Sequence, residues 1–149
     1  AQLGDRPRSL LASGARMSGW LRRRHGLAAP KFVDHSGLGY GSEISARDMT
    51  RLLSAAGGIE PYLDTFKVDL PGHTVRAKTG TLNFVSGLAG YIRPETGRTL
   101  AFAIFAADVA RRDSIPREAR ERPPGARGWA NRARRLQRDM IGLWGKTYA

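Results

Sequence analysis

The sequence predicts an α/β (α+β) fold in which an antiparallel sheet is flanked by helices. Three observations lead to this class. Two apolar runs rich in β-branched and aromatic residues, Leu82–Ile92 and Thr99–Ala107, flank a Pro- and Gly-containing turn at Arg93–Arg98. Residues 128–145 repeat apolar side chains at helical spacing. Residues 8–26 do the same near the N-terminus.

The first predicted helix covers Arg8–Gly26. Its last turn collects three arginines and a histidine, cations that suit the negative end of a helix dipole, and Gly26 is a typical stop. The expected buried stripe consists of Leu10, Leu11, Met17, Trp20 and Leu21.

A second helix is expected to begin after Ser45. Lys31–His35 is short and apolar enough for an extended segment, and Ser36–Ser42 is a glycine-rich loop. Ser45 and Asp48 then match the capping-box pattern, with an acid at the third helical position. Gly57-Gly58 is the expected end. Its predicted buried face consists of Met49, Leu52 and Leu53.

The sheet is predicted from residue 74 onward. Thr74–Lys78 is an expected strand that makes a three-stranded meander with the two apolar runs. Pro61–Phe66 is expected to be a short helix or turn. The continuous apolar character of Leu100–Ala107 predicts a strand covered on both faces.

The C-terminal part is predicted as a loop followed by a helix. Residues 111–127 are polar and contain Pro116, Pro123-Pro124 and Gly125, which indicates a loop. The helix over residues 128–145 is expected to pack on the sheet. Its predicted apolar stripe consists of Trp129, Ala133, Leu136, Met140, Leu143 and Trp144.

Length and composition exclude several classes of protein. A chain of 149 residues has room for one ordinary domain, and 41 % hydrophobic with 26 % charged residues is a globular composition. No apolar run approaches the roughly 20 residues of a transmembrane helix. Ala1–Arg8 has no apolar core of a signal peptide. The absence of cysteine excludes disulfides and thiolate metal sites.

The net charge of +12 first suggests a nucleic-acid partner, but its placement argues against one. Residues 111–139 hold ten arginines and four acids, so half of the excess charge lies in one loop and one helix face. Trp129 is the only aromatic residue in this stretch, so it offers no platform on which nucleic-acid bases could stack. We therefore expect a solvated face or an attraction to an anionic surface, and no nucleic-acid partner.

Lys78-Thr79-Gly80-Thr81 is the strongest candidate for chemistry. A lysine at a strand edge supplies a cation beside a nucleophile and a substrate carboxylate. Both threonines can donate hydroxyls to that carboxylate, and a backbone N–H near Thr81 can donate to an oxyanion. Gly80 removes a side chain where a substrate would lie close to the backbone.

A second motif begins at Asp34. Asp34 and Ser36 can hydrogen-bond local backbone and brace the loop that contains Gly37. Asp34, His35 and Ser36 do not make a credible catalytic triad, because adjacent residues cannot take the required geometry.

Together these blocks resemble the class C low-molecular-mass penicillin-binding proteins, the D-alanyl-D-alanine carboxypeptidase/endopeptidase family, over roughly Leu10 to Ala107. The Lys-Thr-Gly element is known from penicillin-binding proteins. The matching stretches, in the family's order, are Asp34-His35-Ser36-Gly37-Leu38, Ile44-Ser45-Ala46, Ala77-Lys78-Thr79-Gly80-Thr81-Leu82, Ser86-Gly87-Leu88-Ala89-Gly90-Tyr91 and Phe102-Ala103-Ile104.

The resemblance implies a serine β-lactamase/transpeptidase type of fold and an acyl-enzyme reaction on peptidoglycan stem peptides or β-lactams. Lys78 would be a catalytic residue. Thr79, Gly80 and Thr81 would bind substrate, with the Thr81 N–H in the oxyanion hole, and Asp34, Ser36 and Gly37 would be structural neighbours of the site. No cofactor or metal is implied. The location would be periplasmic or otherwise extracytoplasmic.

The chain also departs from the family pattern. His35 replaces a glycine, the stretch between Phe66 and His73 is short, and no serine has Lys three positions on or Asn two positions on. Residues 1–149 are therefore expected to be the C-terminal part of the enzyme, inactive alone and completed by its missing N-terminal half. The open alternatives are a non-catalytic basic binding module and a remnant that needs a partner chain.

Overall fold

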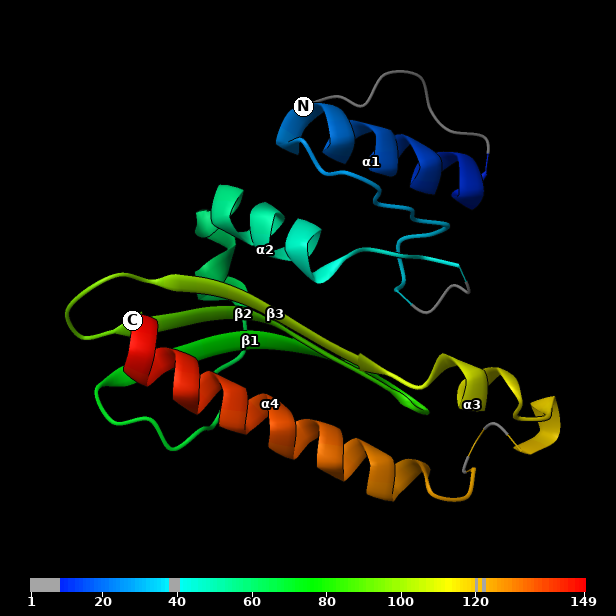
Figure 1. The fold of residues 1–149 in the computed structure, drawn as a ribbon. Helices are drawn as coiled ribbons and strands as arrows, with labels where there is room; N and C mark the ends of the chain where they lie inside the picture. The colour runs from blue at the N-terminus through cyan, green and yellow to red at the C-terminus, as the bar shows by residue number, and fades with distance from the viewer. Residues whose placement is uncertain (1–8, 38–40, 120, 122) are drawn as a thin grey trace. The chain divides into compact units, whose positions relative to one another are not determined.

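The computed structural model describes residues 9–37, 41–119, 121 and 123–149, and these divide into two compact units, one that ends at Ala56 and one that begins at Gly57. Each unit is described by itself. The elements, labelled in Figure 1, are α1 (Leu10–His25), α2 (Ala46–Ala55), η1 (Gly57–Tyr62), β1 (His73–Leu82), β2 (Val85–Pro94), β3 (Leu100–Ala107), α3 (Val109–Asp113), η2 (Arg117–Ala119) and α4 (Ala126–Tyr148).

The first helix of the first unit forms as its sequence predicts. Ser9 caps α1 by accepting a hydrogen bond from the Ala12 N–H at 3.1 Å, and Gly26 ends it in the left-handed conformation at φ 62°. Arg8 and the rest of Ala1–Arg8 lie outside the described residues. The predicted stripe is only partly right, because Leu10 and Leu11 are exposed while Gly14, Ser18 and Leu21 are buried.

Ser18 connects α1 to the chain that follows it. Its hydroxyl donates to the Gly14 carbonyl at 2.9 Å and accepts from the Phe32 N–H at 2.8 Å. The expected extended segment at Lys31–His35 is reduced to one antiparallel bridge, between Lys31 and Glu43. Of the glycine-rich loop, residues 38–40 lie outside the described residues.

The capping box of α2 is half confirmed. Ser45 accepts from the Asp48 N–H at 3.0 Å, as predicted. The Asp48 side chain, however, is buried and accepts from the Ala28 N–H at 3.1 Å and the Ala29 N–H at 3.3 Å. This carboxylate therefore fixes the segment after α1 rather than its own helix cap.

The second unit is built on an antiparallel meander of three strands in the order β1-β2-β3 (Figure 1). The fold class predicted from the sequence, an α+β arrangement with helices beside an antiparallel sheet, is confirmed. The register pairs His73 with Pro94 and Leu82 with Val85, so Asn83 and Phe84 form the turn between β1 and β2. Phe84 has a positive φ of 56°, which is uncommon outside glycine and is a sign of backbone strain.

This turn corrects the sequence prediction at one point. Thr74–Lys78 was expected to end before residue 79 and the next strand to begin at Leu82. The structure instead continues β1 through Lys78-Thr79-Gly80-Thr81 to Leu82, because the β-branched threonines suit a strand and Asn83 suits a turn. The Lys-Thr-Gly element therefore lies within a strand rather than between two strands.

Helix α4 packs across one face of the sheet, against β2 and β3, as expected (Figure 1). It runs two residues further at the start and three further at the end than the predicted 128–145. Leu136 and Leu143, assigned to its apolar stripe, are exposed. Of the same stripe, Ala133 is buried as predicted, and Met140 and Trp144 are partly buried against the core. The fully buried residues of α4 are Ala130, Ala133, Gln137, Ile141 and Gly145. The core around it consists of Leu70, Val75, Ala77, Leu88, Ile92, Phe102, Ile104 and Ile141.

Two further expectations differ from the structure. The stretch 111–127, predicted as a loop, contains the end of α3 and the short helix η2, with residues 120 and 122 outside the described part. In β3, Phe102 and Ile104 are buried, but Phe105 on the opposite face is 43 % exposed, so the strand is not covered on both faces along its length. An apolar run alone does not show which face is covered.

No helix within the described ranges is long and apolar enough to cross a membrane.

Candidate functional site

The outer edge of β1 is partly paired and partly open. The Phe66 N–H donates to the Val75 carbonyl at 2.8 Å, and the Ala77 N–H donates to the Asp64 carbonyl at 2.9 Å. Among the described residues of this unit, backbone pairing on that edge stops at Ala77. The four residues of the Lys-Thr-Gly-Thr element therefore follow where the covering segment ends, and all four are exposed.

Alternation along β1 fixes which backbone groups face outward. The backbone N–H and C=O groups of Val75 and Ala77 point away from β2. Because this direction repeats at every second residue of a strand, the same groups of Thr79 and Thr81 also point away from β2. A segment added along this edge in an extended conformation would meet donors and acceptors from Thr79 and Thr81.

The same alternation divides the side chains between the two faces of the sheet. Thr81 lies opposite Ser86, and Ser86 bonds to Gln137 of α4, so the Thr79 and Thr81 side chains share the face that α4 covers. Lys78 lies on the other face. Among the described residues of the second unit, nothing forms a hydrogen bond or ion pair with its ammonium group.

Gly80 and Gly90 lie in neighbouring strands but differ in the space that a Cβ atom would find at each position. A Cβ at Gly90 would lie 2.6 Å from the Ala77 Cα, so the close approach of β1 and β2 requires glycine there. A Cβ at Gly80 would meet no described atom within 4 Å. The local fold therefore does not require glycine at position 80.

A small cavity of about 230 Å³ opens beside the two threonines, between β1, β2 and α4. Thr79 and Thr81 contribute hydroxyls to it, and α4 contributes Arg134, Gln137 and Arg138. Gln137 and Ser86 are each 2 % exposed, and the Gln137 amide donates to the Ser86 hydroxyl at 3.1 Å and to its carbonyl at 3.2 Å. The cavity thus has a fixed polar floor and two cationic side chains.

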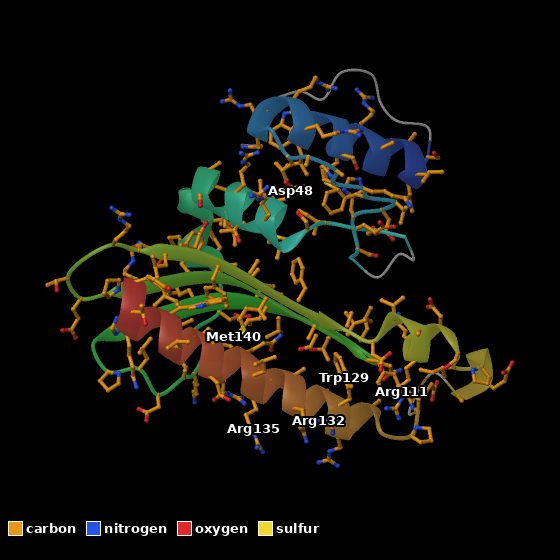
Figure 2. All side chains as sticks on the ribbon, in the orientation of Figure 1. Asp48, Arg111, Trp129, Arg132, Arg135 and Met140 are labelled. Atoms are coloured by element: carbon orange, nitrogen blue, oxygen red, sulfur yellow. The ribbon has the colours of Figure 1, made fainter. Side chains whose placement is uncertain are left out.

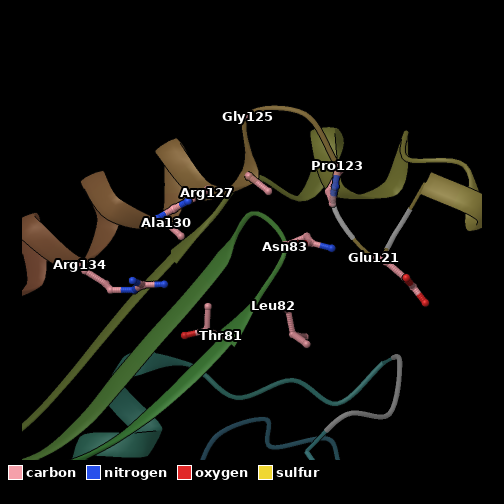
Figure 3. Close-up of a pocket in the computed structure, with 10 residues that line it drawn as sticks. Thr81, Leu82, Asn83, Glu121, Pro123, Gly125, Arg127, Ala130 and Arg134 are labelled. Atoms are coloured by element: carbon pink, nitrogen blue, oxygen red, sulfur yellow. The ribbon is translucent and has the colours of Figure 1, made fainter.

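A larger cavity, about 740 Å³, continues past the end of β1 toward the start of α4 (Figure 3). Thr81 and Arg134 line both cavities, so the two spaces meet at this pair. Figure 3 shows Arg134 extending from α4 toward β1, with Thr81 on the strand below it. Leu82, Asn83 and Arg127 line the far part.

The turn at this end of β1 is held by its own contacts. Phe84 is buried, its ring makes an edge contact with Trp129 of α4 at 6.1 Å between centroids, and the Arg111 guanidinium lies 4.4 Å from its centroid. The Asp108 N–H donates to the Phe84 carbonyl at 2.8 Å. These contacts compensate for the positive φ of Phe84 and keep Thr81 and Asn83 in place.

The opposite face of the sheet carries an ion pair and a buried phenol. Arg93 donates through two nitrogens to the carboxylate of Glu60, which is 7 % exposed, and this bonding raises the pKa of Arg93. Burial, with a further contribution from the Glu60 charge, raises the pKa of Tyr91. Both groups therefore stay in their ordinary ionisation states at neutral pH and act as structural elements.

The remaining predicted site residues belong to the first unit. Asp34 accepts from the Ser36 N–H at 3.0 Å, which is the local bracing expected of this loop, and Gly37 has a positive φ of 72°. His35 bonds through Nε2 to the Ser13 hydroxyl at 2.6 Å. Leu38, the last residue of the motif, lies outside the described residues.

Sequence reasoning missed Arg134 and Arg138. The arginines of residues 111–139 were all assigned to a solvated surface, and Arg132 and Arg135 do extend from α4 away from the sheet (Figure 2). Arg134 and Arg138 lie four residues apart and so share one side of the helix. That spacing, on either side of the buried Gln137, was the available signal. Among the described residues, no group of three or more His, Asp or Glu side chains is placed to hold a metal ion.

Comparison with known proteins adds a distant relative. Carboxypeptidase Rv3627c of Mycobacterium tuberculosis (strain ATCC 25618 / H37Rv) is 26 % identical to the chain over 128 residues. The alignment covers 70 % of this chain and 28 % of that protein, so the chain spans less than a third of its relative.

A family comparison covers the region that contains β1 and its open edge. Residues 24–122, about two thirds of the chain, match the D-Ala-D-Ala carboxypeptidase 3 (S13) family. The match includes the Asp34 motif, the whole three-stranded meander and the Lys-Thr-Gly-Thr element. The chain therefore belongs to the D-Ala-D-Ala carboxypeptidase 3 (S13) family.

Proposed function

We propose that this chain carries the substrate-binding edge of a serine-type D-Ala-D-Ala carboxypeptidase that acts on peptidoglycan stem peptides. The observation that carries the proposal is the open edge of β1 at Lys78–Thr81, where outward backbone groups adjoin a cavity lined by hydroxyls and cations. Membership of a carboxypeptidase family supports the reaction class.

The strand edge explains how a peptide would be held. An extended stem peptide would pair with the N–H and C=O groups of Thr79 and Thr81, as an added strand pairs with a sheet edge. The Thr81 N–H would donate to the carbonyl oxygen of the bond to be cut and would stabilise the oxyanion that develops there. The space beside Gly80 leaves room for the peptide backbone.

The reaction itself needs a nucleophile that the chain does not show in the family pattern. No serine here stands in a Ser-x-x-Lys sequence, so the serine is proposed to come from residues outside these 149. Its oxygen attacks the penultimate D-Ala carbonyl carbon, the C–N bond breaks, and D-alanine leaves with the hydroxyl proton. Water then cleaves the ester, which regenerates the serine and releases the shortened acid.

Lys78 is proposed as the catalytic cation of the site. Its exposed ammonium group lies on the face of β1 opposite the two threonines. There it would lower the cost of the negative charge that develops during attack. β-Lactams would acylate the same serine, and a peptidoglycan substrate implies an extracytoplasmic location.

The test is D-alanine release by the protein translated from the complete coding sequence that contains these residues. An N-acylated tripeptide ending in D-Ala-D-Ala serves as substrate, and a peptide cross-linked through D-Ala measures endopeptidase preference. Lys78→Ala is expected to lower kcat/KM by about a hundredfold or more. Lys67→Ala, an exposed lysine of the same unit, is the matched control. Equal activity of the two variants would overturn the role of Lys78.

A further inference from the structure

The turn between β1 and β2 is the free end of the hairpin that carries the Lys-Thr-Gly-Thr element. Thr81 pairs with Ser86 of β2, and the turn begins two residues later at Asn83. In the described part of this unit, backbone pairing on the outer edge of β1 ends at Ala77, so no neighbouring strand supports Thr81 from that side. The direction of the Thr81 N–H therefore depends on β2 and on the conformation of the turn.

The short segment that follows β3 contacts both residues of this turn. The Asp108 N–H donates to the Phe84 carbonyl at 2.8 Å, and Arg112 donates through Nη1 to the Asn83 carbonyl at 3.1 Å. The Asp108 carboxylate also caps α3, because it accepts from the Arg111 N–H at 3.1 Å. The Arg111 guanidinium lies 4.4 Å from the centroid of the Phe84 ring. This segment thus holds the turn at both of its carbonyls and at its buried ring.

Arg111 also connects the turn to the start of α4. Its Nη2 donates to the Pro124 carbonyl at 3.2 Å, directly before Gly125, which caps the helix. A Cβ at Gly125 would lie 2.6 Å from the same nitrogen, so a larger residue there would displace the guanidinium. On α4 itself, Trp129 makes the edge contact with the Phe84 ring. Figure 2 shows Arg111 and Trp129 at the same end of the sheet. One guanidinium therefore joins the turn, α3 and the beginning of α4.

The turn conformation that these contacts hold is strained. Phe84 has a φ of 56°, a region that residues other than glycine rarely adopt, and its side chain is 1 % exposed. Such a conformation persists only where the surrounding contacts determine it. Loss of the Arg111 guanidinium would let Phe84 relax toward a negative φ. That change would rotate the peptide groups at the end of β1, among them the Thr81 N–H.

Arg111 itself lies outside the space in which a ligand would bind. It lines neither the small nor the larger cavity, whereas Thr81 lines both. An effect of Arg111 on a reaction at β1 must therefore act through the turn. An oxyanion donor is effective when it is fixed before the reaction begins, and a displacement of about 1 Å costs a rate factor on the order of a hundred.

We propose that Arg111 is a positioning residue of the carboxypeptidase, which fixes the Thr81 N–H for the oxyanion by holding the Asn83-Phe84 turn. The inference rests on the proposed function, because only that reaction gives the direction of this N–H a chemical consequence. It assigns a role to α3, which the polar composition of residues 111–127 did not indicate.

The structural part of the proposal is tested on the 149-residue chain by NMR relaxation of its backbone amides. Arg111→Ala is expected to lower the order parameters of Thr81 and Phe84 from about 0.85 to below about 0.6. An unchanged amide signal of Ile92, in the core of the sheet, shows that the variant is folded. Arg111→Lys should keep part of the order, because an ammonium group also binds the face of an aromatic ring. Arg135→Ala, which removes a side chain directed away from the sheet, should change nothing (Figure 2).

The catalytic part is tested by D-alanine release from the complete protein. Arg111→Ala should lower kcat about tenfold or more and change KM by less than about twofold, because Arg111 lines no described cavity. Arg111→Lys should recover part of kcat, and Arg135→Ala should retain all of it.

Different results separate failure of this inference from failure of the proposed function. Unchanged order at Thr81 and Phe84 in Arg111→Ala would show that Arg111 does not hold the turn. An unchanged kcat, or a rise in KM alone, would overturn its positioning role while the function stands. If the complete protein with Arg111 in place releases no D-alanine, the proposed function is wrong, and the order parameters alone decide whether Arg111 holds the turn.

Discussion

Replacing Gly80 and Gly90 with alanine should have opposite effects on stability, although both lie in the same pair of strands. At Gly90 the new Cβ would lie 2.6 Å from the Ala77 Cα and 2.8 Å from the Ala77 Cβ. Both distances are shorter than van der Waals contact, so β1 and β2 must move apart. Overpacking of this kind costs about 1–3 kcal/mol.

At Gly80 the added methyl group meets no described atom within 4 Å, and its φ is not in the left-handed region. Alanine there restricts the unfolded chain more than glycine does, which stabilises the folded state by about 0.4–1 kcal/mol. The two variants should therefore differ in free energy of unfolding by about 1.5–4 kcal/mol.

Urea unfolding followed by tryptophan fluorescence measures this difference. Trp129 and Trp144 both lie on α4, in the same unit as the two glycines. Stability and ligand binding should not change together. Gly80→Ala should stay folded but bind N-acetyl-D-alanyl-D-alanine more weakly than the unchanged chain. If Gly80→Ala is destabilised as strongly as Gly90→Ala, the space at position 80 is not open. If Gly80→Ala binds the peptide as well as the unchanged chain, that space is not used by the ligand.

Three further predictions concern buried polar groups. Ser86→Ala and Gln137→Leu should each cost about 1–3 kcal/mol, while the double variant should cost less than their sum, as a urea-based double-mutant cycle would show; additive costs would contradict this. Because the folded-state pKa of Tyr91 is raised, its contribution to stability is complete below pH 10 and is lost at higher pH. The loss of stability above pH 10 should therefore be smaller in Tyr91→Phe, and an unchanged dependence of stability on pH would contradict this role of Tyr91. Asp48→Ala should destabilise the first unit by about 2–3 kcal/mol and speed hydrogen exchange at Ala28 and Ala29, because it removes the acceptor of both amides; unchanged exchange would refute it.

Local patterns in the sequence were sufficient where local chemistry decides the structure. Ser45 caps its helix and Gly26 ends the preceding one because capping depends on a few neighbouring residues. The hairpin of β2 and β3 follows from two apolar runs and the turn between them. The Lys-Thr-Gly-Thr element was found for the same reason, as a short motif with a distinctive composition.

The sequence predictions fail where contacts between residues far apart in the sequence decide which side of a helix is buried. Leu136 and Leu143 have the spacing of a helical stripe, but the face that meets the sheet contains Gln137 and Ile141. A polar residue on that face becomes acceptable only because Ser86 of β2 lies opposite it. No local pattern contains this pairing.

The cationic cavity was missed for a related reason. Arg134 and Arg135 are adjacent in the sequence and have the same composition-based assignment, yet they extend to different sides of α4. Only the packing of α4 over Thr79 and Thr81 distinguishes the cation at the cavity from the one away from the sheet.

In the proposed enzyme, β1 supplies the substrate edge and the nucleophilic serine lies outside these 149 residues. Labelled penicillin, followed by mass spectrometry of the acylated peptide, tests it directly. The 149-residue chain should remain unlabelled. The product of the complete coding sequence should be labelled on a serine within Ser-x-x-Lys, and Lys78→Ala should slow that labelling. Acylation of any serine within these 149 residues would show that the nucleophile does not lie outside them.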